Sequence, residues 1–148
     1  MSDTYDQAYL KKLTILYVED EELTREMTSQ FLARITKGLI TAENGREGVE
    51  AFRTHKPDII LTDIQMPVMD GLTMAGEIRD MDKMIPIIIL TAFCNADFLN
   101  KANSLNVDRF VIKPVDGSLL HDALLACAHR LMIEKQLKLA QNMLHPAT

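Results

Sequence analysis

Short, largely apolar runs recur along the chain at residues 14–18, 39–42, 58–63, 86–91 and 108–112. Runs without polar alternation are typical of strands buried on both faces of a parallel sheet. Apolar residues at helical spacing lie between them and predict helices over 23–35, 46–55, 71–82 and 96–106. In the first helix the stripe is Leu23, Met27, Phe31 and Ile35. A last helix begins at Asp116 and meets no stop before His145 and Pro146.

Strands and helices therefore alternate along the whole chain. This alternation predicts an α/β fold, a (βα)5 doubly wound five-stranded parallel sheet of the flavodoxin-like kind, with an extended C-terminal helix. We expect the strand order 2-1-3-4-5 of such a sheet, in which right-handed crossovers bring the first and third strands side by side. We expect a lead-in at residues 1–12, one domain at 13–130 and a helical extension at 131–148.

The chain is acidic, with a net charge of -5 over 148 residues and an isoelectric point near 5.3. This balance argues against direct nucleic-acid binding, which relies on clustered Lys and Arg. The polar, acidic start lacks the apolar stretch of a signal peptide. No run approaches the roughly 18 apolar residues of a membrane helix. We therefore expect a cytoplasmic protein without membrane contact.

Polar side chains stand at the carboxyl ends of four predicted strands: Glu19 and Asp20, Asp63, Thr91, and Lys113. The strand order puts the first and third strands side by side, so the three acids share one crevice. Carboxylates this close repel one another and need a cation, and a set of oxygen ligands suits Mg²⁺. Lys113 adds a positive charge and Thr91 a hydroxyl donor. Both complement a phosphoryl group on or next to Asp63.

Five segments carry a resemblance to a known family: residues 17–20, 57–63, 66–71, 89–92 and 110–114. In this order and spacing the chain resembles the receiver domain of two-component response regulators, from residue 13 to about residue 130. Each segment alone is a weak signal. Together the five are highly specific.

The resemblance implies that Asp63 accepts a phosphoryl group from a phosphohistidine on a sensor histidine kinase or a histidine phosphotransfer protein. It also implies that Asp20, Asp63 and the backbone carbonyl of Gln65 bind Mg²⁺, with Glu19 assisting through water. Many relatives carry Asp at the position of Glu19. Lys113 is expected to contact the acyl phosphate, and the bond between Lys113 and Pro114 is expected to be cis.

The family also implies a switch. Its Thr hydroxyl, here Thr91, is drawn to the phosphate, and the aromatic residue at Phe110 moves inward. This would remodel the helix over 96–106, the strand over 108–112 and the last helix. Gln65 and Phe93 are positions expected to tune the lifetime of the acyl phosphate. A bulky Phe93 would screen it from water, so we expect slow self-dephosphorylation.

The last helix continues well past residue 130. Its early stripe of Leu120, Leu124, Cys127 and Leu131 should pack on the sheet. A second stripe of Ile133, Leu137, Ala140 and Leu144 has the 4-3-4 spacing of a coiled-coil seam, over fewer heptads than a firm assignment needs. We expect a homodimer through this helix and a further domain beyond it, although a helix end lying on its own domain is the simpler alternative.

Two other functions use related chemistry or a related fold. An aspartate-nucleophile, Mg²⁺-dependent phosphohydrolase also uses a strand-end Asp, but it needs a second acid two residues later, where this chain has Gln65. A flavodoxin-like cofactor binder needs a Ser/Thr/Gly-rich loop after the first strand, and the acids at 19–22 would repel its phosphate. The sequence therefore favours a signalling switch that catalyses only its own phosphoryl transfer and dephosphorylation.

Overall fold

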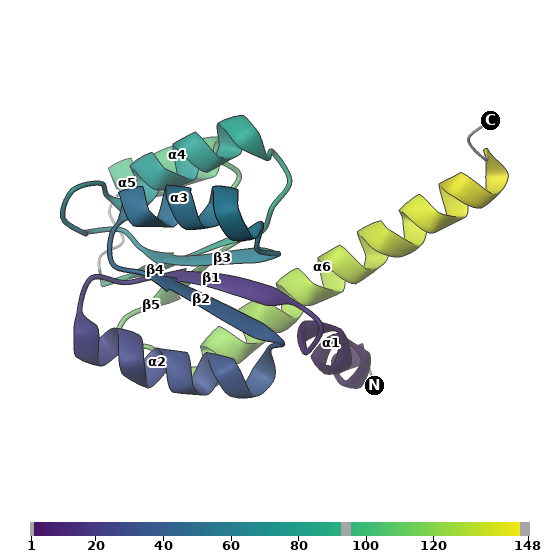
Figure 1. The fold of residues 1–148 in the computed structure, drawn as a ribbon, viewed down its shortest axis with the longest axis horizontal. Helices are drawn as coiled ribbons and strands as arrows, with labels where there is room; N and C mark the ends of the chain where they lie inside the picture. Colours follow the sequence, from purple (N-terminus) through teal and green to yellow (C-terminus); the bar gives the residue numbers. More distant parts are fainter. Residues whose placement is uncertain (1, 93–95, 146–148) are drawn as a thin grey trace.

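The computed structural model describes residues 2–92 and 96–145 (Figure 1). Its elements are α1 (Ser2–Leu10), β1 (Thr14–Val18), α2 (Glu22–Ile35), β2 (Gly38–Ala42), α3 (Gly45–His55), β3 (Ile59–Asp63), α4 (Gly71–Met81), β4 (Ile87–Thr91), α5 (Ala96–Ser104), β5 (Arg109–Ile112) and α6 (Gly117–Leu144). The predicted alternation of strands and helices is confirmed. The helix before the first strand was not predicted.

The five strands form one parallel sheet in the order β2-β1-β3-β4-β5, as predicted (Figure 1). In this register Val18 lies opposite Thr62, and Asp63 lies opposite Leu90. Thr91 lies opposite Ile112 at the end of β5. All the strands therefore end at the same edge of the sheet.

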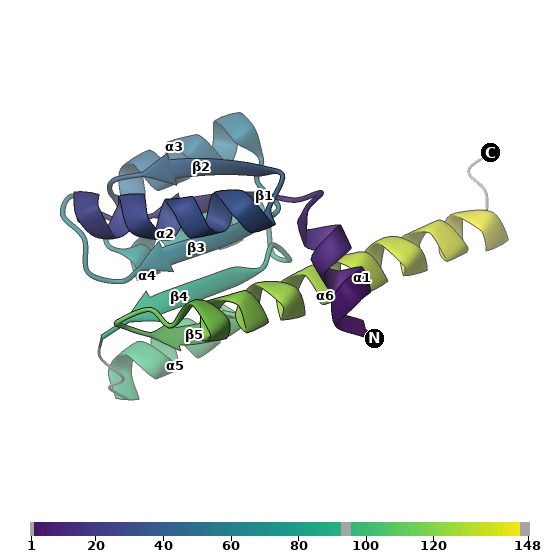
Figure 2. The same ribbon diagram turned by 90° about the horizontal axis from the view of Figure 1, so that it is seen from below.

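Helices cover both faces of the sheet (Figures 1 and 2). Ile15 and Tyr17 of β1 pack in the layer shared with α2 and α6. Leu16 and Val18 pack in the opposite layer, with α3 and α4. All four side chains are 0% exposed. Since neither face meets water, the strand shows no polar alternation in its sequence.

The N-terminal half of α2 turns polar side chains inward. Leu32 is the buried residue of this helix, whereas Leu23 and Met27 are 63% and 64% exposed. Arg25 and Thr28 are half-buried in the same turns. Arg25 contacts the Glu19 carbonyl and the Glu43 carboxylate there. The predicted apolar stripe is therefore only partly buried.

The lead-in at residues 1–12 contains helix α1, which packs across α6 (Figure 2). Leu10 is 1% exposed and Leu13 is 6% exposed, and both belong to the core beneath α6. Asp6 Oδ1 lies 2.9 Å from His129 Nδ1 on α6. The lead-in is therefore a packed part of the domain.

Helix α6 begins where the Asp116 carboxylate accepts hydrogen bonds from the backbone N–H groups of Ser118 and Leu119, at 2.8 and 3.3 Å. Its first half packs on the sheet, and its second half extends away from the domain (Figures 1 and 2). The residues of the first half that are buried or packed on the core include Leu120, Leu124, Cys127 and Leu131, as predicted. Among the described helices, none combines the length and the hydropathy that a membrane span requires.

Candidate functional site: an acidic cluster at the strand ends

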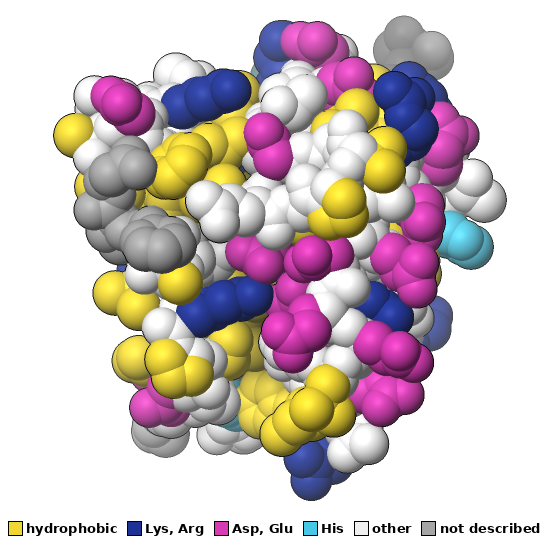
Figure 3. Space-filling model, turned by 90° about the vertical axis from the view of Figure 1, so that its left-hand side faces the viewer, with side chains coloured by type: hydrophobic (Ala, Val, Ile, Leu, Met, Phe, Trp, Pro, Cys, Tyr) yellow, Lys and Arg dark blue, Asp and Glu magenta, His cyan; other side chains and the backbone are white. Residues whose placement is uncertain are grey.

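The sheet edge where the strands end carries the candidate site. Figure 3 faces this edge and shows acidic side chains gathered in the middle of the surface, with basic side chains beside them. Glu19 follows β1 directly, Asp63 is the last residue of β3, and Lys113 follows β5 directly. Thr91 is the last residue of β4. The strand order, rather than closeness in sequence, brings these residues together.

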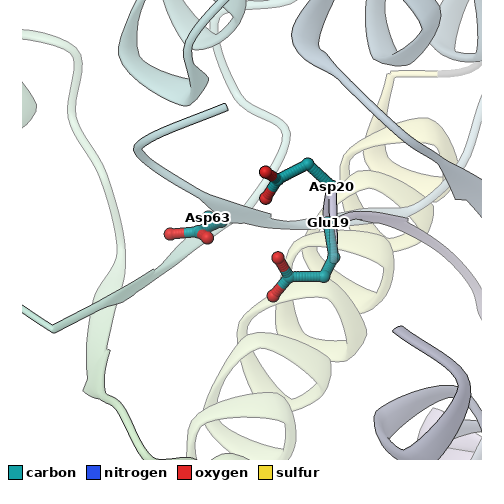
Figure 4. Close-up of side chains that lie close together, drawn as sticks. All are labelled: Glu19, Asp20 and Asp63. Atoms are coloured by element: carbon teal, nitrogen blue, oxygen red, sulfur yellow. The ribbon is translucent and has the colours of Figure 1, made fainter. Parts of the chain in front are cut away.

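Glu19, Asp20 and Asp63 form a compact cluster (Figure 4). One carboxylate oxygen from each residue can be chosen so that all three lie within 4.8 Å of one another. Glu19 is 1% exposed, the Asp63 side chain is 14% exposed, and Asp20 is open to solvent. Three hard oxygen donors at this spacing fit a divalent cation such as Mg²⁺.

Lys113 bridges two of these acids. Its Nζ donates to Glu19 Oε1 and to Asp63 Oδ2, both at 2.8 Å. Burial raises the pKa of Glu19, and the contact with Lys113 opposes this. Burial alone would lower the pKa of Lys113, but its bonds to Asp63 and Glu19 raise that pKa above its usual value. Lys113 therefore remains charged and partly neutralises the cluster.

The backbone around Asp63 fixes its side chain. Asp63 Oδ1 accepts a hydrogen bond of 2.7 Å from the N–H of Ile64, which leaves Oδ2 to Lys113. Gly71 is the first residue of α4, after the loop that follows Asp63, and its N–H donates to the Ile64 carbonyl at 2.8 Å. A Cβ at Gly71 would lie only 1.9 Å from the Asp63 carbonyl oxygen, so only glycine fits there. The Asp70 side chain caps α4 by accepting a hydrogen bond from the N–H of Thr73. The bond between Lys113 and Pro114 is cis, as predicted.

A cavity of about 130 Å³ lies beside Asp63. Its lining includes Asp63, Gln65, Thr91, Phe98 and Lys113. Thr91 is 5% exposed, whereas Gln65 is open to solvent. Thr91 and Lys113 thus line the same cavity as Asp63, the predicted phosphoacceptor.

Phe110 is half-buried and lies on β5 opposite Ile89. It also lines a shallow groove of about 410 Å³ between β5 and α6, together with Ile112 and Leu119. Phe93 lies outside the described residues, and Gln65 lines the cavity beside Asp63. The effect of both residues on the lifetime of the acyl phosphate stays a prediction.

Two side chains at this edge were not singled out from the sequence. Phe98 lines the cavity beside Thr91, and Arg25 contacts the backbone of Glu19. Each lies in the first turn of a helix that follows a strand, Arg25 in α2 after β1 and Phe98 in α5 after β4. This position after a strand end is the only feature of the sequence that could have marked them as site residues.

A family model of the response regulator receiver domain matches residues 15–125. The chain belongs to this family. The receiver is 35% identical over 106 residues to the transcriptional regulatory protein CseB of Streptomyces avermitilis, covering 72% of this chain and 45% of CseB. It is 31% identical over 110 residues to the chemotaxis protein CheY of Halobacterium salinarum, covering 74% of this chain and 92% of CheY. The receiver therefore spans less than half of CseB but most of CheY.

Solved structures agree with this assignment. The N-terminal domain of an uncharacterized protein from Wolinella succinogenes matches with a TM-score of 0.78 at 33% identity, over 82% of this chain and 98% of that domain. The relatives support a role for the receiver in phosphorelay signalling. None of them favours the phosphohydrolase alternative.

We expect Lys113→Ala to lower the free energy of unfolding by about 2 kcal/mol near pH 7 without divalent ions, because it removes the cation from a buried acid. Burial already raises the pKa of Glu19, and without Lys113 this pKa rises further. The folded state then binds the Glu19 proton more tightly than the unfolded state. The loss of stability should therefore shrink as the pH falls through that raised pKa. Urea unfolding near pH 7 and about pH 5 measures the difference.

Adding Glu19→Gln to Lys113→Ala provides the control, since it removes the unpaired buried charge. We expect this double variant to regain much of the lost stability near pH 7. A loss of the same size at both pH values would show that Lys113 does not act through the charge of Glu19.

Proposed function

We propose that this receiver takes a phosphoryl group from a phosphohistidine onto Asp63. The donor protein is a sensor histidine kinase or a histidine phosphotransfer protein. The observation that carries the proposal is the place of the Asp63 carboxylate, 2.8 Å from Lys113 Nζ and clustered with Glu19 and Asp20. An Asp63 oxygen attacks phosphorus, the P–N bond breaks, and the imidazole keeps the bonding electron pair. The product is an acyl phosphate on Asp63.

The acids supply the site for the Mg²⁺ that this chemistry needs. Glu19, Asp20, Asp63 and the backbone carbonyl of Gln65 would hold the ion, with Glu19 acting through water. When bound, Mg²⁺ neutralises the acids and the incoming phosphoryl oxygens. The proposal is supported by the all-oxygen chemistry of the cluster and by its family.

Lys113 and Thr91 act on the phosphoryl group itself. In the unphosphorylated receiver Lys113 Nζ donates to Asp63 Oδ2. After phosphoryl transfer the same ammonium group can donate to a phosphoryl oxygen. Thr91 lines the same cavity and offers its hydroxyl to another oxygen. The new anion thus gains a charged donor from the loop after β5 and a neutral donor from β4.

The movement of Thr91 toward the phosphate opens space that Phe110 fills. In this proposal Phe110 moves inward and remodels the surface formed by α5, β5 and α6. Phe has no hydroxyl, so the switch depends on packing alone. The half-buried state of Phe110 supports the proposal, because the ring has room to become more buried.

We further propose a division of the chain into a lead-in (1–12), the receiver (13–130) and a C-terminal extension (131–148) that forms a coiled-coil linker to a further domain. Ile133, Leu137 and Leu144 are 39%, 58% and 76% exposed, which is the state of a seam that lacks its partner. A second copy of this chain is the proposed partner. Nucleic acid is not a proposed ligand, because the chain is acidic.

The receiver acts, in this proposal, as a cytoplasmic phosphoprotein and not as an enzyme on other substrates. Gln65 supports this, because an amide cannot serve as the acid and base that a phosphohydrolase needs at that position. Turnover is then limited to the receiver's own acyl phosphate.

Incubation with acetyl phosphate and Mg²⁺ tests the acceptor directly. We expect wild-type protein to gain the mass of one phosphoryl group and Asp63→Asn to gain none, since an amide is a poor nucleophile. Asp122→Asn, which changes an exposed acid on α6, is the control and should react like the wild type. Intact-mass spectrometry measures the adduct. An adduct on Asp63→Asn, or none on the wild type, would refute the proposal.

The proposed switch predicts that a substitution at Phe110 can abolish the structural response to phosphorylation without abolishing phosphorylation itself. We expect Phe110→Ala to be phosphorylated as the wild type is, but to lose most of the phosphorylation-dependent shifts of the β5 and α6 amides in NMR spectra. Phe110→Leu keeps an apolar bulk and should retain more of the response. Undiminished shifts in Phe110→Ala would rule out this role.

The proposed seam makes a prediction about self-association. We expect Leu137→Glu to weaken the dimer about a hundredfold, since two buried Leu side chains are lost per dimer. Leu139→Glu is the matched control, because Leu139 is 54% exposed on the same helix but lies off the seam. Analytical ultracentrifugation, with and without acetyl phosphate, measures both. Equal effects of the two substitutions would contradict the seam.

A further inference from the structure

Arg25, at the end of the first turn of α2, reaches back to the acidic loop that precedes the helix. Its Nη1 donates to the Glu19 carbonyl at 2.8 Å and lies 3.5 Å from the Asp20 carbonyl. Its Nη2 pairs with Glu43 Oε1 at 3.3 Å. The Arg25 side chain is only 14% exposed, so these contacts form in a partly dry environment.

The carbonyls that Arg25 contacts lie beyond the regular sheet. The N–H of Glu19 still donates to the Ala42 carbonyl, at 3.0 Å, but the paired strands end at Val18 and Ala42. A buried carbonyl without a donor is costly. The planar guanidinium of Arg25 directs Nη1 to the carbonyls and Nη2 to Glu43, a geometry that a lysine ammonium controls less well.

The other contacts of the loop hold its two ends: Lys113 and the Ala42 carbonyl bond Glu19, and the Thr24 hydroxyl donates to Glu21 Oε1 at 2.6 Å. Glu21 occupies the N-cap position of α2, yet its side chain makes no capping hydrogen bond to the helix backbone. The N–H of Glu21 reaches Glu19 Oε2 at 3.3 Å, a long bond. Acids stand at every position from 19 to 22, and their mutual repulsion opposes a fixed loop.

We propose that Arg25 is a positioning residue for the metal-binding acids. By holding the Glu19 carbonyl, and through its longer contact with the Asp20 carbonyl, it keeps an oxygen of each carboxylate within 4.8 Å of one on Asp63. This inference rests on the proposed Mg²⁺ site. In this role Arg25 acts through the backbone carbonyls of Glu19 and Asp20 and does not contact the Mg²⁺ ion.

Charge and position make opposite predictions for this residue. A positive charge near a cation site weakens cation binding, so removal of the charge alone would tighten it. If Arg25 instead orders the ligands, its removal weakens binding even though a repelling charge is gone. The sign of the change in affinity therefore identifies the role.

The experiment compares Mg²⁺ affinities of the full chain by isothermal titration calorimetry. We expect Arg25→Met, which keeps much of the apolar stem, to bind Mg²⁺ about tenfold more weakly, in the range seen when residues supporting metal ligands are replaced. Arg25→Lys keeps the charge and one donor and should recover part of the affinity. Glu43→Gln removes the ion pair but leaves the carbonyl bonds, and should bind as the wild type does.

Melting temperatures measured without Mg²⁺ separate this role from a purely structural one. Unchanged or tighter binding by Arg25→Met overturns the inference, and so does a lower melting temperature with unchanged affinity. If Arg25→Met does not fold, Arg25→Gln replaces it under the same criteria. Failure of the wild type to bind Mg²⁺ would instead refute the proposed metal site, which keeps the two failures distinct.

Discussion

The repulsion among Glu19, Asp20 and Asp63 is the constraint on which the rest of the site depends. Negative charges at this spacing destabilise the fold unless a cation faces them, and Glu19 has little water to screen it. Lys113 offsets part of the repulsion through two bonds of 2.8 Å. Lys113 follows the last strand of the sheet, so this compensation depends on the complete sheet.

The sheet can hold such a cluster because its centre is apolar on both faces. The first three residues of β3, Ile59, Ile60 and Leu61, are all 0% exposed. Burial of each Leu or Ile side chain contributes about 1.5–3 kcal/mol, and many such side chains line the two layers. The sequence predicted this part of the fold, because continuous apolar runs that end in polar residues encode both the strands and their edge.

Other features were not predictable from periodicity. Helix α1 contributes Leu10 to the core and Asp6 to a contact with His129, and its packing site depends on where α6 passes. Met27 belongs to a regular apolar stripe yet is 64% exposed, because α2 begins beside charged strand ends. Arg25 looks like any charged helix residue in the sequence. These contacts come from tertiary placement, which no local pattern records.

The place of β5 at one edge of the sheet is consistent with the proposed switch. β1, β3 and β4 each have strand neighbours on both sides, whereas β2 and β5 are edge strands. Of these two, β5 is the one followed directly by Lys113, which contacts Glu19 and Asp63. The residues of β5 include Ile112, 59% exposed, and the half-buried Phe110. An edge strand moves with the loss of fewer backbone hydrogen bonds than a central one. β5 is also followed by Lys113, whose Nζ contacts Asp63 at 2.8 Å, and then by α6, so the segment after β5 connects the acidic cluster to the long helix.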